Sequence, residues 1–333
     1  MKKITIITLL LLASCQIGGT SRTPGPQLDT TGTQGLEVVV NPASNTQVLM
    51  CGESNVLLDL YNLGTSDIIQ GAYSLVTEDQ LLLLLGKTKK QGSITLEGRS
   101  MNSPVGGFTQ LQFAFKSENL PAQLEMYQTP FIFTACYPYM TRASIPVCID
   151  TTRDPQAARS CVTSQVSGSA GQGAPVVVSM VEPIMAIQDN AILPTFVIHI
   201  TNAGKGRVVS PESLGFACGN QGSAGSRIKV TAQLQDETLT CKPEIIDLRA
   251  GETKVTCQSD TYFGAADGRA NQGTFTTPLT VNLEYGYVTT TTLPITITRL
   301  AHQEDCSGAR AQTSAQSTTS TNTQRGAKWP PQS

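Results

Sequence analysis

Residues 58–64, LDLYNLG, return at an offset of 140 as residues 198–204, IHITNAG. Each stretch begins in a short apolar segment of the kind that forms a strand, and each ends in Asn-x-Gly. Asn and Gly tolerate a positive φ, so the pair can end a strand and turn the chain tightly. We therefore predict matching strands in two copies of one structural unit.

Further landmarks follow in the same order in both halves of the chain. Residues 38–42 match residues 179–183 at an offset of 141, and residues 137–141 match 285–289 at an offset of 148. A constant order with nearly constant offsets indicates a true internal repeat. The protein is therefore predicted to contain two copies of a unit of about 120 residues, with small insertions in the second.

Ten short segments are apolar or alternating and are bounded by Gly, Pro, Asn and Ser, as strands are. They are residues 36–40, 56–60, 109–115, 131–135, 176–181, 196–200, 228–234, 253–257, 279–283 and 293–297. No segment shows a sustained helical period. The predicted fold class is all-β, with two tandem β-sandwiches.

Composition sets the expected domain limits. Stretches rich in Gly, Ser, Thr, Pro and Gln cannot bury enough apolar surface to fold alone, so we expect them to be flexible. The predicted plan is a signal peptide 1–14, a lipidated cysteine and tether 15–35, domain one 36–161, a linker 162–174, domain two 175–306, and a disordered tail 307–333.

The N-terminus reads as an export signal. Lys2 and Lys3 precede a short apolar core, residues 4–12, and Leu-Ala-Ser-Cys then resembles a lipobox ending at Cys15. A lipid on Cys15 would anchor the chain at the outer face of a membrane. No other apolar stretch is long enough to span a bilayer.

Nine cysteines are present, and setting Cys15 aside leaves eight. An even number in an exported chain predicts four disulfides. Cys51 and Cys136 both lack a counterpart in the second copy, so we predict that they pair with each other. The other predicted pairs are Cys148–Cys161, Cys241–Cys257 and Cys218–Cys306, with exchanges among the last four cysteines left open.

Two Asn-x-Gly steps and two Tyr-x-Tyr steps recur: Asn62-Leu63-Gly64 and Asn202-Ala203-Gly204, with Tyr137/Tyr139 and Tyr285/Tyr287. This pattern resembles Ig-like surface domains, in particular the CARDB-type adhesion modules of bacterial and archaeal exported proteins. The resemblance implies binding by surfaces, and Ig-type sandwiches commonly place a tyrosine at a corner. We expect the four tyrosines to be structural. The sequence does not decide between a bacterium and an archaeon.

Residues suited to catalysis are scarce. His199 falls in a predicted strand, where we expect an outward or satisfied side chain, and His302 falls at a domain edge. The two histidines give no metal-ligand spacing, and the acidic loop residues Asp189, Asp260 and Asp267 form no calcium motif. We predict no enzyme activity, no metal and no cofactor.

The net charge of −2 argues against a nucleic-acid partner. The expected protein is a membrane-anchored surface lipoprotein whose Ig-like domains bind another surface or envelope protein, with no small-molecule substrate. An alternative is an accessory subunit of a pilus, secretion or transport complex. A second alternative, a hydrolase or sugar-binding module, would need facing carboxylates or an aromatic platform, and Trp329 lies in the tail.

Overall fold

The structure, a computed structural model, describes residues 30–306 except 87, 153–155, 157, 169–170, 189–190, 220–224, 249–250 and 263–272. The predicted signal peptide, Cys15, most of the tether and the tail 307–333 lie outside the described residues. Within that range the chain is mostly β-strand, and its α-helical residues are confined to α1 (Leu214–Cys218). No helix in the described part has the length and apolar character needed to cross a membrane.

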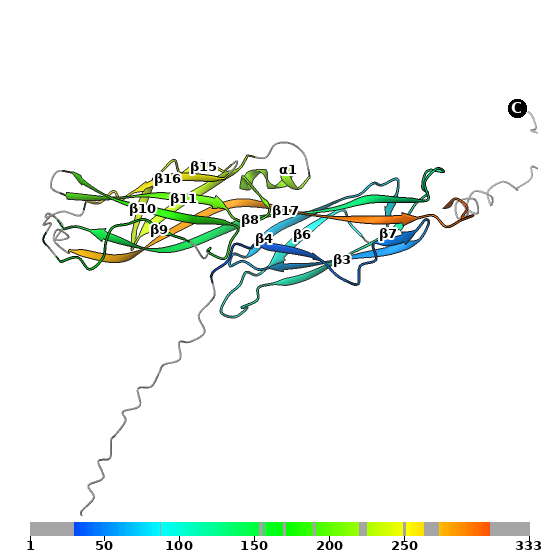
Figure 1. Cartoon of the computed structure of the whole chain (residues 1–333), viewed down its shortest axis with the longest axis horizontal. Coiled ribbons are helices and arrows are strands. Elements are labelled where there is room, and N and C mark those ends of the chain that lie inside the picture. The colour runs from blue at the N-terminus through cyan, green and yellow to red at the C-terminus, as the bar shows by residue number, and fades with distance from the viewer. Residues whose placement is uncertain are drawn as a thin grey trace, which may run out of the picture.

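Two strands of 25 residues each, β8 (Met126–Asp150) and β17 (Thr274–Thr298), form the axis of the molecule. They pair antiparallel along their whole length, and Pro138 lies opposite Gly286 at the midpoint. Figure 1 shows an elongated molecule with one lobe toward each end of this pair. The first lobe holds β1–β7 and the second holds β9–β16. We call the region around Pro138 and Gly286 the waist.

The first lobe has a separate four-stranded sheet in the order β1-β3-β7-β5. Its other strands extend the long pair: β4 pairs with β8 and carries β6, and β2 pairs with β17 in parallel. The bounds are β1 Leu36–Val40, β2 Gln47–Leu49, β3 Glu53–Asn62, β4 Ile68–Val76, β5 Leu82–Leu84, β6 Gln91–Leu96 and β7 Phe108–Ser117.

In the second lobe, β13 pairs with β17, and β14 joins β13 to the run β16-β11-β10-β9. β12 pairs with β17 beside the waist, and β15 pairs with β13. The bounds are β9 Val166–Ser167, β10 Val176–Gln188, β11 Ala191–Asn202, β12 Arg207–Val209, β13 Arg227–Leu234, β14 Glu237–Lys242, β15 Ile245–Asp247 and β16 Glu252–Gln258.

Alternating side chains give these strands an apolar face. In β7, Phe113 and Phe115 are buried, whereas Phe108, Gln110 and Gln112 on the opposite face are exposed. Buried residues from both lobes form one continuous hydrophobic cluster that passes through the waist. Every one of the ten predicted strands coincides with a strand of the structure, and the all-β prediction is confirmed.

The strand pairing differs from the predicted division into 36–161 and 175–306. The first half of β8 and the second half of β17 belong to the first lobe, and the other halves belong to the second. Each lobe therefore takes one long strand segment from the other copy. β8 contains no Gly or Asn that would end it at the waist. Residues 162–174, predicted as a linker, instead supply β9, which pairs with β10.

Four disulfides join cysteines of the described chain, and they indicate an oxidising, extracytoplasmic location. Two predicted pairs are confirmed, Cys148–Cys161 and Cys241–Cys257. The predicted pairs Cys51–Cys136 and Cys218–Cys306 are wrong. The structure instead pairs Cys51 with Cys306 and Cys136 with Cys218.

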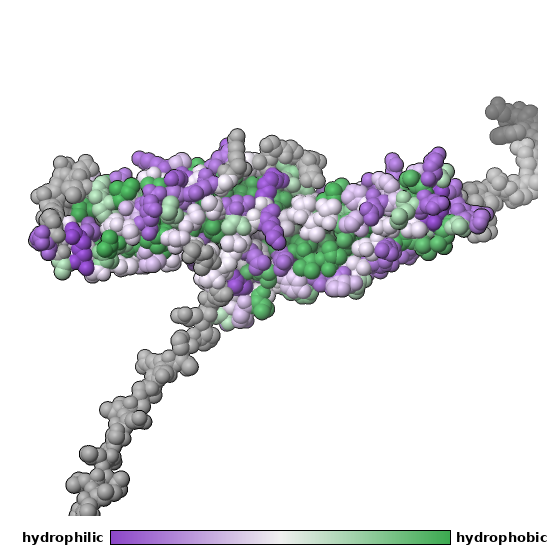
Figure 2. Space-filling model, in the orientation of Figure 1, coloured by the Kyte–Doolittle hydropathy of each residue, from purple (hydrophilic) through white to green (hydrophobic). Residues whose placement is uncertain are grey.

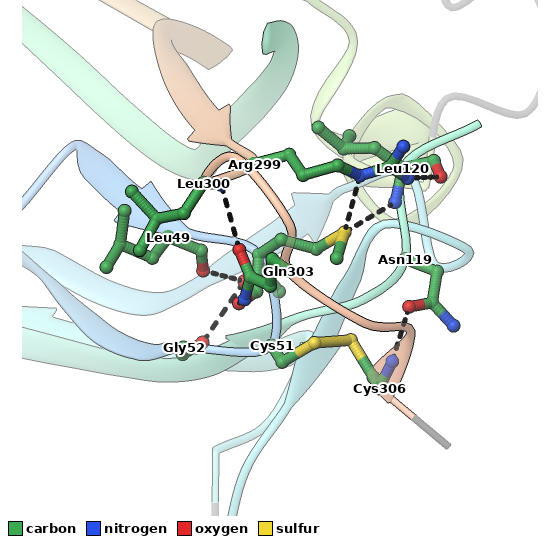
Figure 3. The surroundings of a disulfide bond; sticks show 11 residues. Leu49, Cys51, Gly52, Asn119, Leu120, Arg299, Leu300, Gln303 and Cys306 are labelled. Atoms are coloured by element: carbon green, nitrogen blue, oxygen red, sulfur yellow. Dashed lines mark hydrogen bonds between the residues drawn. A yellow bond between two sulfur atoms is a disulfide. The ribbon is translucent and has the colours of Figure 1, made fainter. Parts of the chain in front are cut away.

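The strand exchange explains both errors. Because β17 ends in the first lobe beside β2, the chain after it reaches Cys51, and the Cα atoms of Cys51 and Cys306 lie 5.4 Å apart. Figure 3 shows the hydrogen bonds around this disulfide: the Cys306 N–H donates to Asn119 Oδ1 at 2.7 Å, and Gln303 Nε2 donates to the Met50 carbonyl at 2.6 Å. Cys136 lies near the waist, where α1 packs against β8 and brings Cys218 to it.

Candidate functional site

Four tyrosines meet at the waist because two pairs of them are opposite one another in the β8–β17 register. Tyr137 lies opposite Tyr287, and Tyr139 lies opposite Tyr285. Ring centroids are 5.4 Å apart for Tyr137–Tyr139, 6.0 Å for Tyr137–Tyr287, 6.3 Å for Tyr139–Tyr285 and 6.2 Å for Tyr285–Tyr287. Such tilted and edge-on aromatic contacts are favourable beyond their area. The four rings join the two copies of the repeat.

The phenol groups repeat the same hydrogen bonds in both copies. The Leu36 N–H donates to the Tyr137 hydroxyl at 3.1 Å, and the Val176 N–H donates to the Tyr285 hydroxyl at 3.4 Å. These backbone groups begin β1 and β10, so the tyrosines fix where both strands start.

The other two phenols bind the Asn-x-Gly steps. Tyr139 donates to Asn62 Oδ1 at 2.9 Å, and Tyr287 donates to Asn202 Oδ1 at 3.1 Å. The glycine of each step is required for close approach and not for a positive φ, since neither Asn nor Gly of these steps is among the residues with positive φ. A Cβ on Gly64 would lie 1.9 Å from the Tyr139 hydroxyl. The predicted φ role is therefore wrong.

Burial is the main influence on these phenols. It raises the pKa of Tyr137, Tyr139, Tyr285 and Tyr287 above the ordinary value. Hydrogen bonds with backbone groups, joined in Tyr137, Tyr285 and Tyr287 by a hydroxyl or carboxamide partner, offset this rise only in part. At neutral pH all four are uncharged hydrogen-bonding groups. They are suited to holding the waist together rather than to proton transfer.

Beside the tyrosines, a cleft of about 340 Å³ opens between the two lobes. One wall is residues 33–38, which run into β1, and another is residues 289–291 of β17. Pro175, residues 203–206 and Tyr287 complete the lining. The cleft thus lies between an edge of the four-stranded sheet and an edge of the large sheet.

The β1 wall offers unpaired backbone groups. β1 is the terminal strand of its sheet and pairs only with β3. The Asn41 N–H donates to the Leu57 carbonyl and the Gly35 carbonyl accepts from Leu63, so odd-numbered residues face β3. Even-numbered residues face the cleft, and the N–H and C=O of Val38 have no hydrogen-bond partner among the described residues.

The second copy shows the same edge closed. Val178 of β10 pairs with Ile200 as Val38 pairs with Leu60, so Val178 corresponds to Val38 at an offset of 140. A bulge between Val178 and Met180 moves the offset to 141 from Met180 on, so the sequence match of residue 38 to residue 179 is wrong by one position. Its N–H donates to Gln172 Oε1 at 3.0 Å, and its carbonyl accepts from Gln172 Nε2 at 3.2 Å. β9 then pairs with Met180 and Val181. The offset of 140 places Gly32, which has no side chain, at the position of Gln172.

The β17 wall is open as well. β12 pairs with β17 only as far as Val288, and β2 begins to pair with it at Thr296. Between them, the edge of β17 that faces away from β8 has no strand partner in the described chain. Pro294 falls in this gap, as expected for an edge strand, because proline has no N–H to donate. Leu293 and Val38 are half-buried beside the core.

The remaining candidates give no catalytic constellation. His199 is buried, with Nε2 2.5 Å from Glu182 Oε1 and Nδ1 against Glu252, so it is satisfied as expected. His302 is exposed, and Asp260 accepts a hydrogen bond from Thr240. Asp189, Asp267 and Trp329 lie outside the described residues. The described residues contain no group of three or more His, Cys, Asp or Glu able to hold a metal.

Sequence reasoning missed the cleft, although the repeat carried a signal for it in the Gln172–Gly32 difference. Lys205 also lines the cleft. Neither the known protein families nor the curated proteins include a match to this chain.

Proposed function

We propose that this protein is an exported surface lipoprotein, anchored through Cys15, in which two Ig-like β-sandwich lobes act as one rigid, non-enzymatic binding module. Its ligand is an extended segment of another surface or envelope protein. That segment adds as a strand to β1 in the waist cleft.

One observation carries this proposal: the backbone edge that Gln172 and β9 occupy in the second lobe has no occupant among the described residues of the first. Gln172 shows how such an edge is satisfied, since it accepts a hydrogen bond from the Val178 N–H and donates one to the Val178 carbonyl. Peptides bind to exposed sheet edges in this way, with backbone hydrogen bonds for affinity and alternate side chains for selectivity. The half-buried Val38, Val40 and Leu293 would receive apolar side chains of the added strand.

The exchanged strands make the two lobes one rigid body. β8 and β17 pass from one lobe to the other as a continuous ladder, so no single connecting segment can act as a hinge. A rigid body keeps the cleft in one shape, which lowers the entropy that a ligand must lose on binding. The four disulfides, which persist in an oxidising space, also restrict the movement of the chain.

A site-specific crosslinking experiment tests the proposal. A photoreactive amino acid at Val39, on the outer face of β1, should crosslink to one segment of one partner in the cells that make the protein. The matched control is the same amino acid at Met180, the repeat equivalent of Val39, where β9 already covers the edge.

Val38→Pro should abolish the crosslink at position 39, because proline removes the N–H that faces the cleft. Crosslinking that is equal at both positions, or that survives Val38→Pro, would contradict strand addition. Membrane fractionation of Cys15→Ala tests the anchor separately, since release of the variant is expected.

A further inference from the structure

The loop between β6 and β7 carries exposed apolar residues near the waist. Met101 is 58% exposed and Val105 78% exposed, and Phe108 at the start of β7 is 54% exposed. The Phe108 ring packs on the Tyr61 ring with centroids 4.9 Å apart, and this contact holds the Phe108 side chain in place. Figure 2 shows hydrophobic side chains on the segment that projects from the waist.

Hydrogen bonds shape the tip of this loop in advance. The Ser100 and Ser103 N–H groups each donate to the carbonyl of the other residue, at 3.0 and 3.1 Å, and the Gly106 N–H donates to the Ser103 carbonyl at 3.1 Å. A loop held in this way presents Met101 and Val105 outward without a further loss of conformational freedom. Single exposed apolar residues are common, but Met101 and Val105 lie four residues apart on one ordered loop and Phe108 begins the strand that follows, and such a concentration of exposed apolar residues is typical of an interaction surface.

The described chain begins beside this loop. Arg99 Nη2 donates to the Thr31 carbonyl at 2.6 Å, and Gly32 lies against the same guanidinium. Figure 1 shows the loop that leads into β7 on the side of the waist from which the N-terminal end emerges. Fifteen residue steps separate Cys15 from Thr30, and a fully extended chain of that length spans about 50 Å at most. A lipid on Cys15 would therefore hold the start of the described chain, and the loop beside it, within about 50 Å of the bilayer.

We propose that Met101, Val105 and Phe108 form a membrane-contacting surface that seats the waist on the lipid bilayer. This rests on the proposed anchor at Cys15. Apolar side chains enter the boundary between headgroups and acyl chains, and the covalent lipid supplies the second attachment that stable binding needs. Glu97 is exposed beside the loop and Arg99 is engaged by Thr31, so the contact does not depend on anionic lipid.

Tryptophan fluorescence tests this contact. Trp329 is the only tryptophan, so a Trp329→Phe background lets one new indole report its surroundings. The chain from residue 16 onward, held on phosphatidylcholine vesicles by an N-terminal polyhistidine tag and a nickel-chelating lipid, replaces the anchor. In that chain Val105→Trp should shift its emission to the blue and lose most of its intensity to brominated phosphatidylcholine.

The matched control is Ile245→Trp, at an exposed apolar position of β15 in the second lobe, which should show neither effect. Adding Met101→Asp should return the Val105→Trp spectrum to that of the protein without vesicles. An indole at 105 that is unaffected by the bilayer, or affected no more than the one at 245, would overturn the inference. Because the tag replaces the lipid, that result is independent of whether Cys15 is modified.

Discussion

The two lobes are built from the same repeat, yet one closes its outer strand and the other leaves it open. In the second lobe, Gln172 and β9 satisfy the backbone of β10 from Val178 to Val181. In the first lobe, β1 presents Val38 to a cleft with no described partner. The lobes therefore differ in the segment that precedes the first strand of each copy, which covers the strand edge in one lobe and, among the described residues, leaves it uncovered in the other.

Raising the pH should destabilise the protein most, because it ionises the buried tyrosines that both lobes share at the waist. Burial raises the pKa of Tyr137, Tyr139 and Tyr285, so the folded state holds their protons more tightly than the unfolded state does. Their stabilisation is complete below the unfolded pKa of about 10 and is lost as pH rises above it, at about 1.4 kcal/mol per unit for each phenol. Both lobes should unfold together between about pH 10 and 12.

Circular dichroism and absorbance near 295 nm would follow that transition in one titration. Cooperative unfolding with phenolate appearing at the same pH is expected. If the first lobe unfolded at a clearly lower pH than the second, the tyrosines would not be a shared support.

Removing one disulfide from each lobe in turn compares how much each disulfide contributes to the free energy of unfolding. Replacing Cys51 and Cys306 by serine should lower the free energy of unfolding by about 2–5 kcal/mol. The same change at Cys148 and Cys161 should cost less, because those residues are 13 apart in sequence against 255. Urea unfolding of the two double variants measures the difference. If the Cys148/Cys161 variant lost more stability than the Cys51/Cys306 variant, the entropy of the unfolded chain would not determine which disulfide contributes more.

Gln172→Ala should leave the edge of β10 at Val178 unpaired, as the edge of β1 is at Val38. It removes both hydrogen bonds to Val178 and should cost about 1–3 kcal/mol. Hydrogen exchange at the Val178 amide should accelerate, while exchange in β1 stays unchanged and serves as the internal control. Unaltered exchange at Val178 would mean that β9 alone closes this edge.

Val38→Pro should have the smallest effect on stability, within about 0.5 kcal/mol, because the N–H that it removes has no described partner. The matched change Val39→Pro removes an N–H that faces β3 and leaves its acceptor in β3 without a hydrogen bond, which should destabilise the protein by about 1–3 kcal/mol. Thermal unfolding of the two variants distinguishes them. Equal losses would show that the edge of β1 is not free.

Local patterns in the sequence predicted a large part of this structure. The strand at 109–115 followed from period-two alternation, and Cys148–Cys161 and Cys241–Cys257 followed from short separations. Cys51 and Cys136 were paired wrongly because that inference assumed each copy to fold on its own residues. The cleft at the waist was harder to predict than the disulfides, because a strand edge is unpaired only when no other segment of the folded chain lies beside it.

Alternation and repetition are local properties of one chain, so the strands, the two copies, the even number of cysteines and the four tyrosines can be read from the sequence. Three further features depend on long-range packing: β8 and β17 run on through the waist, Cys306 reaches Cys51, and Gln172 closes one edge while the described residues around Gly32 leave the other open. The physical reason is that antiparallel pairing joins residues far apart in the chain, so its register emerges only when both lobes pack around one core.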